Sequence, residues 1–145
     1  MHGPSASPLA GFKVTVAPDL PLVQLDALRL KRLLRNLLDN ALRHSRSSGQ
    51  PNGAAVQVDL RRQTHAVGGY EVLQLSVCDH GPGVAEAQLP HLAEPFLRGD
   101  AGRQRSTRGV GLGLYLCRLV AQAHGGSLQF RNAQPGLEVV VSLPL

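Results

Sequence analysis

Residues 26–45 read DALRLKRLLRNLLDNALRHS, and this is the strongest helical pattern in the chain. At 100° per residue, six apolar side chains fall in one arc, and the charged residues Arg32, Arg35 and Asp39 lie opposite it. The arc consists of Leu30, Leu33, Leu34, Leu37, Leu38 and Ala41. The pattern predicts a long amphipathic helix that packs its leucines against a core.

The stretches on both sides of this helix predict a sheet, because alternating or apolar runs are bounded there by turn residues. We expect strands at residues 13–17, 56–61, 71–79, 127–131 and 137–143. The second and third of these can pair in antiparallel fashion. Further helices are expected over 85–93 and from 111 or 112 to 124. The order predicts an α/β (α+β) two-layer sandwich with a mixed sheet and helices on one face.

The composition fits one soluble globular domain, since 43% of the 145 residues are hydrophobic and 17% are charged. The two cysteines are isolated, which argues against a disulfide framework or a zinc site and suits a reducing compartment. No apolar run approaches the roughly 18 residues of a membrane span. Residues 1–11 lack the pattern of a signal peptide, and we interpret them as a linker or chain edge.

The chain is basic, with a formal net charge of +5 and 13 arginines among its 15 cationic residues. A basic excess indicates a polyanionic partner, and nucleic acid, nucleotide phosphates and an acidic protein all qualify. Part of the charge lies in residues 94–109, a polar stretch that is punctuated by glycine and has no periodicity. That composition predicts a loop, but charge alone does not choose among the partners.

The first motif with chemical potential lies on the predicted long helix. Asn36, Asn40 and Arg43 share one flank of the apolar arc, and His44 lies between that flank and the arc. Carboxamide oxygens can help to hold Mg²⁺, which prefers hard oxygen ligands and keeps several waters beside phosphates. The alternative is an amphipathic helix whose asparagines serve only side-chain networks, and the motif taken alone favours it.

The second motif reads DHGPG at residues 79–83 and follows a predicted strand directly. The carboxylate of Asp79 can accept a hydrogen bond from an exocyclic amine such as that of adenine. Gly81 and Gly83 would let the backbone approach a flat base, because they have no Cβ atom. The alternative is an ordinary turn of a sheet protein, which the motif taken alone again favours.

Two further motifs surround the second predicted helix. Residues 109–114 read GVGLGL, and glycine N–H groups at a helix N-terminus can hold phosphates. Neither the dinucleotide-binding spacing nor a P-loop is present, and the alternative is a flexible hinge. Residues 94–100 read EPFLRGD, where a buried Phe96 would fix the base of the loop. Its arginines could fold over phosphates, and the alternative is a solvated basic loop.

Taken in order, the four motifs NxxxNAxRHS, DxGPG, EPFxRxD and GxGLGL are specific. Their succession resembles the nucleotide-binding domain of bacterial sensor histidine kinases, within the GHKL ATPase superfamily and its Bergerat-type fold. They correspond to that family's asparagine box, first glycine box, phenylalanine box and second glycine box. The resemblance extends from about Lys13 to Leu145 and implies a catalytic ATP-binding domain over residues 12–145, with an ATP lid at about 84–110.

The resemblance implies a role for each matching residue on the helix that carries the asparagine box. Asn40 would be the Mg²⁺ ligand, and Asn36 would lie near the metal and the phosphates as part of the catalytic set. Arg43 would contact phosphate, and His44 would pack against adenine. The two cofactors implied are ATP and Mg²⁺.

The glycine boxes would then enclose the nucleotide. Asp79 would accept the hydrogen bond of the adenine amine, Gly81 and Gly83 would shape the base pocket, and Val84 would pack on the ring. Arg98 and Arg108 are the candidate catalytic arginines for phosphate contact. The phosphate side would be closed by the second glycine box and the residues that support it, namely Gly109, Val110, Gly111, Leu112, Gly113 and Leu114.

Two departures from the family pattern affect the expected function. Leu137 occupies a position where many members carry a threonine in the adenine network. None of the six histidines lies in a segment like HELRxPL, which carries the phosphoacceptor in this family. The resemblance therefore implies that the chain transfers the γ-phosphoryl group of Mg-ATP to a histidine of a separate helical dimerisation domain, with a response regulator downstream.

The resemblance also implies a parent sensor that is anchored in the inner membrane, with this domain monomeric and in the cytoplasm. The main alternative is a nucleotide-sensing interaction module of the same fold that has lost catalysis, against which the intact asparagines, Asp79 and the glycines argue. A basic nucleic-acid binder ranks third. Aromatic residues for stacking on bases make up only 3% of the chain, so no nucleic-acid partner is expected.

Overall fold

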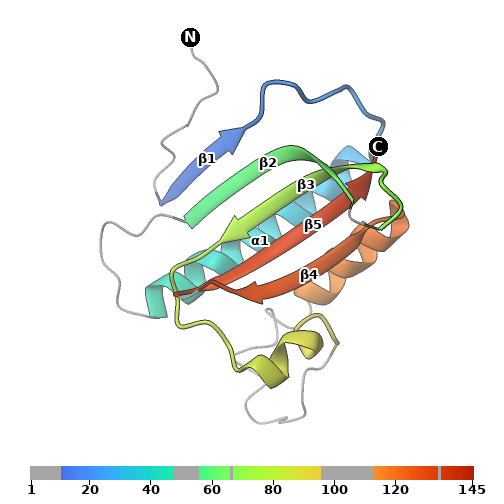
Figure 1. Ribbon diagram of the computed structural model, residues 1–145. Helices are drawn as coiled ribbons and strands as arrows, with labels where there is room; N and C mark the ends of the chain where they lie inside the picture. The colour runs from blue at the N-terminus through green and yellow to red at the C-terminus, as the bar shows by residue number, and fades with distance from the viewer. Residues whose placement is uncertain (1–10, 48–55, 66, 96–112, 134) are drawn as a thin grey trace.

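The computed structural model describes residues 11–47, 56–65, 67–95, 113–133 and 135–145, which form a sheet with helices packed against it (Figure 1). The sheet has five strands in the order β1-β2-β3-β5-β4. Their bounds are Phe12–Val16 for β1, Val56–Thr64 for β2, Glu71–Cys78 for β3, Ser127–Asn132 for β4 and Leu137–Pro144 for β5. Strand β1 is parallel to β2, and every other neighbouring pair is antiparallel. The predicted mixed sheet is confirmed.

The long helix α1 spans Ala27–Ser47 and lies on the same side of the sheet as a second helix over residues 113–123 (Figure 1). Helix α1 begins after Asp26, whose Oδ1 accepts the N–H of Arg29 at 3.1 Å and so caps the first turn. Three residues of the predicted apolar arc are buried, namely Leu33, Leu37 and Ala41. The predicted two-layer arrangement, with helices on one face, is therefore confirmed.

The core between the helices and the sheet is aliphatic. From the second helix, Leu114, Cys117 and Ala121 reach it, at spacings of three and four residues that place them on one helical face. From the sheet, it takes alternate residues of the strands, because successive side chains point to opposite faces. Those residues are Val56, Val58, Val77, Leu137, Val139, Val141 and Leu143.

The structure differs from the expected elements in detail. The helix expected over 85–93 is a 3₁₀ helix, η1, over Glu86–His91, and the proline at position 90 inside it has no N–H to donate. The sequence pattern did not predict that β5 lies between β3 and β4. In the described parts of the chain, no helix has the length and apolarity that a membrane crossing requires.

Candidate functional site

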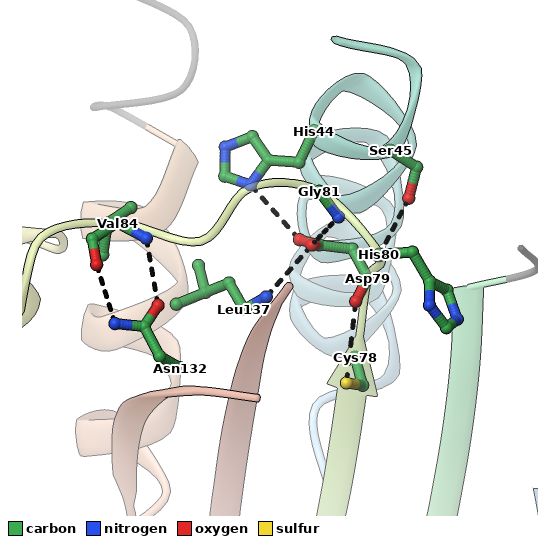
Figure 2. A network of polar contacts seen from close by, with 9 residues as sticks. All are labelled: His44, Ser45, Cys78, Asp79, His80, Gly81, Val84, Asn132 and Leu137. Atoms are coloured by element: carbon green, nitrogen blue, oxygen red, sulfur yellow. Dashed lines mark hydrogen bonds and ion pairs between the residues drawn. The ribbon is translucent and has the colours of Figure 1, made fainter. Parts of the chain in front are cut away.

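Asp79 follows the last residue of β3 and is the centre of a polar network in which the backbone holds one of its oxygens (Figure 2). The side chain is 2% exposed. Its Oδ1 accepts the N–H of Gly81 at 2.8 Å and the N–H of Leu137 at 3.0 Å. The N–H of Asp79 in turn donates to the carbonyl of Leu137 at 3.1 Å. Backbone groups on both sides therefore fix the orientation of this carboxylate.

The second oxygen of Asp79 faces a side chain rather than the backbone. Nδ1 of His44, on α1, lies 3.2 Å from Oδ2 of Asp79 (Figure 2). The His44 side chain is 26% exposed, so this contact lies at the border between the buried carboxylate and solvent. Oδ1 already accepts two hydrogen bonds. Oδ2 is therefore the oxygen through which Asp79 can accept a hydrogen bond from a ligand.

The two glycines of DHGPG allow this segment to lie close to its neighbours. A Cβ atom on Gly81 would lie 2.6 Å from the carbonyl oxygen of His44. Gly83 has a φ of +78°, and a Cβ atom there would lie 2.7 Å from Oδ1 of Asn132. In the described structure, the close approach that requires glycine is therefore to α1 and to the end of β4.

Two residues of this network were missed by sequence reasoning, which left residues 132–136 between two predicted strands and assigned them no role. Asn132 ends β4, and its side-chain amide bonds both backbone groups of Val84: Oδ1 accepts the N–H at 3.0 Å and Nδ2 donates to the carbonyl at 2.7 Å. A Cβ atom on Gly136 would lie 1.8 Å from the carbonyl oxygen of Asp79. The only sequence signal was the Pro-Gly pair of the turn. We call Asp79, His44, Val84, Asn132 and Gly136 the Asp79 cluster.

A second group of residues lies on α1 before His44 and at the start of the second helix. Asn40 is 3% exposed, and within the described part of the chain no donor reaches its Oδ1. Asn36 is half-buried, and a Cβ atom on Gly113 would lie 3.4 Å from its Oδ1. The fold thus brings Asn36 of α1 beside the start of the second helix. We call Asn36, Asn40 and Gly113 the asparagine cluster.

The remaining predicted site residues are divided between exposed, buried and undescribed positions. Arg43 is exposed on α1, and Leu114 is buried in the core at 2% exposure. A groove of about 510 Å³ beside Asn36 is lined in part by Arg29, Arg32 and Leu116. The other predicted residues lie outside the described part of the chain: Phe96, Arg98, Arg108, Gly109, Val110, Gly111 and Leu112.

The unpaired oxygen on α1 is of the type that hard metal ions prefer. The described residues include no group of three or more histidine, cysteine, aspartate or glutamate side chains that could hold an ion. Asn40, by contrast, offers an uncharged buried oxygen that no donor from the described residues reaches. A hard ion such as Mg²⁺, which takes one or two protein oxygens and completes its shell with phosphates and water, fits that oxygen.

The two cysteines are poor nucleophiles. Burial raises the pKa of the Cys117 thiol to about 12, and its Sγ lies 3.5 Å from the carbonyl oxygen of Leu33. Burial, followed by the charges of Glu138 and Asp79, also raises the pKa of Cys78. Both thiols therefore stay protonated near neutral pH, which disfavours a nucleophilic role for either.

Comparison with known proteins defines the class. Residues 25–145 match the family described as histidine kinase-, DNA gyrase B-, and HSP90-like ATPase. The chain belongs to this family. The expected GHKL fold and the resemblance to the catalytic ATP-binding domain of a histidine kinase are thereby confirmed.

Among individual proteins, the chain is 41% identical over 135 residues to the sensor protein SphS of Synechococcus elongatus, a match that covers 89% of this chain and 30% of that protein. The mycobacterial sensor histidine kinase MprB superposes with a TM-score of 0.68 at 32% identity, over 92% of this chain and 80% of that structure. Full-length ShkA in complex with AMPPNP gives a TM-score of 0.65 at 27% identity, over 92% of this chain and 26% of ShkA. This chain thus corresponds to a minor part of SphS and ShkA.

Proposed function

We propose that this chain binds Mg-ATP and transfers the γ-phosphoryl group to a histidine on a separate helical dimerisation domain, as part of a two-component signalling protein. One observation carries the proposal. Asp79 is buried and fixed at Oδ1 by two backbone N–H groups, while the contact of Oδ2 among the described residues is with the side chain of His44. A carboxylate held in this way is suited to select a ligand by one donor group.

The Asp79 cluster would bind the base. Oδ2 of Asp79 accepts the exocyclic amine of adenine, and the ring of His44 moves off this oxygen or shares it as the base enters. Gly81 and Gly83 keep the segment between them close to α1 and β4, and Val84 packs on the ring. The complex of ShkA with an ATP analogue supports ATP as the nucleotide.

The asparagine cluster and the arginines would bind the phosphates. Asn40 would hold Mg²⁺ through Oδ1, with Asn36 beside it, and the bound ion would offset negative charge on the phosphates. Phosphoryl transfer depends mainly on positioning and electrostatic stabilisation, so no strong base is required of this chain. The other residues proposed to contact or support the phosphates are Arg43, Arg98, Arg108, Gly109, Val110, Gly111, Leu112, Gly113 and Leu114.

The remaining parts of the proposal concern the surroundings of the site. The ATP-binding domain would span residues 12–145, with residues 1–11 as a linker and about 84–110 as the lid over the nucleotide. The partners would be the helical domain that carries the phosphoacceptor histidine and a response regulator, with no nucleic acid. The parent protein would be a membrane-anchored sensor with this domain in the cytoplasm, and relatives named as a sensor protein and a signal transduction kinase support the sensing role.

Calorimetric titration with ADP and AMPPNP, with and without Mg²⁺, tests the binding step. We expect Mg²⁺-dependent binding by the wild type and a loss of affinity of about 30-fold in Asp79→Asn, because a hydrogen bond to a charged group is replaced by two facing donors. Asp59→Asn is the matched control, since Asp59 lies on β2, outside the Asp79 cluster. Failure of the wild type to bind either nucleotide would refute the proposal.

Transfer is tested by adding a separately produced dimerisation domain of the same parent kinase and ³²P-labelled ATP. We expect acid-labile label on its histidine, and none when that histidine is replaced. Nucleotide binding without transfer to a folded partner would instead support the inactive nucleotide-sensing module. Rapid ATP hydrolysis without a partner would contradict the proposed division of labour.

A further inference from the structure

Asn132 makes side-chain hydrogen bonds that could not be predicted from its position in the sequence. It is the last residue of β4, and it belongs to none of the four motifs. Its side-chain amide forms two hydrogen bonds with the backbone of Val84, at 3.0 and 2.7 Å. Its Nδ2 also lies 3.3 Å from Oε2 of Glu86, at the start of η1 (Figure 2 shows the Val84 pair).

This pairing imitates the contact between neighbouring strands. The amide of Asn132 presents one acceptor and one donor to the N–H and the carbonyl of a single residue, as an adjacent strand would. The preceding Gly83 has a φ of +78° and leaves no room for a Cβ atom between itself and Asn132. The chain that leaves the DHGPG motif is therefore clamped at Val84, although Val84 lies in no strand or helix.

The same hairpin also holds Asp79. The turn between β4 and β5 is closed by the N–H of Ala133, which donates to the carbonyl of Gly136 at 2.9 Å. The next residue, Leu137, donates its N–H to Oδ1 of Asp79. Asn132 and Leu137, which are paired across β4 and β5, thus hold Val84 and the carboxylate of Asp79 respectively, and so set their separation.

We propose that Asn132 is a positioning residue for the purine: it holds Val84 at a fixed place relative to Oδ2 of Asp79, so that both sides of the base pocket exist before the nucleotide binds. The inference rests on the proposed binding of adenine at Asp79. Without the clamp, the segment at Val84 must be ordered by the ligand, and ordering about one residue lowers affinity roughly tenfold.

The test compares Asn132→Ala with Arg131→Ala. Arg131 is the preceding residue of β4 and also loses side-chain hydrogen bonds when truncated, but these run to Glu138. We expect Asn132→Ala to weaken ADP and adenosine by the same factor of about ten, because the effect is at the base, and Arg131→Ala to leave both unchanged. Melting temperatures without nucleotide show whether either variant is generally destabilised.

A second measurement does not depend on nucleotide. Hydrogen exchange of the Val84 amide in the free protein should be faster by tenfold or more in Asn132→Ala, while the amides of β3 and β5 keep their protection. Wild-type affinity for ADP in a folded Asn132→Ala, or a loss for ADP without a loss for adenosine, would overturn the inference. Failure of the proposed function is distinct from both, because the wild type would then bind neither ligand.

Discussion

Asp79 and Asn40 are two polar side chains buried to nearly the same degree, at 2% and 3% exposure, but their oxygens differ in hydrogen bonding. Oδ1 of Asp79 accepts two backbone N–H groups, and Oδ2 faces His44. Oδ1 of Asn40 has no donor among the residues that the structure describes. Most buried polar atoms in folded proteins are paired, so the unpaired one requires an explanation.

This difference in hydrogen bonding distinguishes the Asp79 cluster from the asparagine cluster. The Asp79 cluster is completed by the protein itself, so its geometry is part of the fold, and changes there should lower stability as well as binding. In the asparagine cluster, Oδ1 of Asn40 lacks a partner among the described residues, and a ligand could supply one. Changes there should therefore affect binding with little effect on stability. Substitutions in the two clusters therefore give a direct test of the distinction.

The largest effect is expected for Gly136→Ala. A Cβ atom there would lie 1.8 Å from the carbonyl oxygen of Asp79, and the φ of +99° is unfavourable for alanine. We expect the free energy of unfolding to fall by about 4 kcal/mol or more in urea titrations, with loss of ADP binding.

Gly126→Ala is the matched control for this effect. Its Cβ atom would lie 1.9 Å from the carbonyl oxygen of Ser142, just before β4 begins and away from the Asp79 cluster. We expect a comparable loss of stability, but the fraction that remains folded should keep its affinity for ADP. Equal loss of ADP affinity in both folded variants would contradict a special role for the turn at Gly136.

Asp79→Ala is expected to have the next largest effect. It leaves the buried N–H groups of Gly81 and Leu137 without an acceptor, and each such loss costs about 1–3 kcal/mol. We expect a drop of about 3 kcal/mol in the free energy of unfolding. Asp79→Asn keeps an acceptor for both groups, so it should be clearly more stable than Asp79→Ala in the same urea titration. Equal stabilities would show that Oδ1 does not support the fold.

Cys117, a buried residue of the core, provides a pH-dependent test. Burial raises the pKa of its thiol from 9.0 to about 12, so the unfolded chain loses this proton at lower pH than the folded one. Stability is therefore fully present below pH 9 and falls between pH 9 and 12, by about 1.4 kcal/mol per pH unit. Chemical unfolding at pH 9 to 11 should show a steeper decline for the wild type than for Cys117→Ala. Parallel curves would mean that solvent reaches this thiol.

Much of the fold could be predicted from the sequence because its patterns are local. The leucine spacing of residues 26–45 predicted α1, and the alternation of Val56 and Val58 predicted β2, whose antiparallel pairing with β3 is confirmed. The insertion of β5 between β3 and β4 could not be predicted, because no local pattern records which strands become neighbours. The 3₁₀ geometry of η1 was missed for a local reason, since a short segment with Pro90 has few hydrogen bonds to distinguish helix types.

The candidate site shows the same division. Asp79, Gly81 and the asparagines stand in motifs of fixed spacing, so they could be named from the sequence, although their roles in binding stay predictions. Asn132 could not be named, because its function in the fold arises from a contact with Val84 across 48 positions of the chain. The pairing of His44 with Asp79 likewise joins residues 35 positions apart, and the sequence offered only a role against the base.

The smallest expected effect on stability is that of Asn40→Ala, and it tests the comparison most directly. Because Oδ1 of Asn40 has no donor in the described structure, its removal breaks no hydrogen bond of that oxygen, and the free energy of unfolding should change by less than about 1 kcal/mol. Binding should respond in the opposite way: calorimetry should show that Mg²⁺ no longer strengthens ADP binding, while the Mg²⁺-independent part remains. Asp79→Ala, at equal burial, should give the reverse balance. If Asn40→Ala were as destabilising as Asp79→Ala while Mg²⁺ still strengthened ADP binding, Asn40 would be a structural residue and the two clusters would not differ in kind.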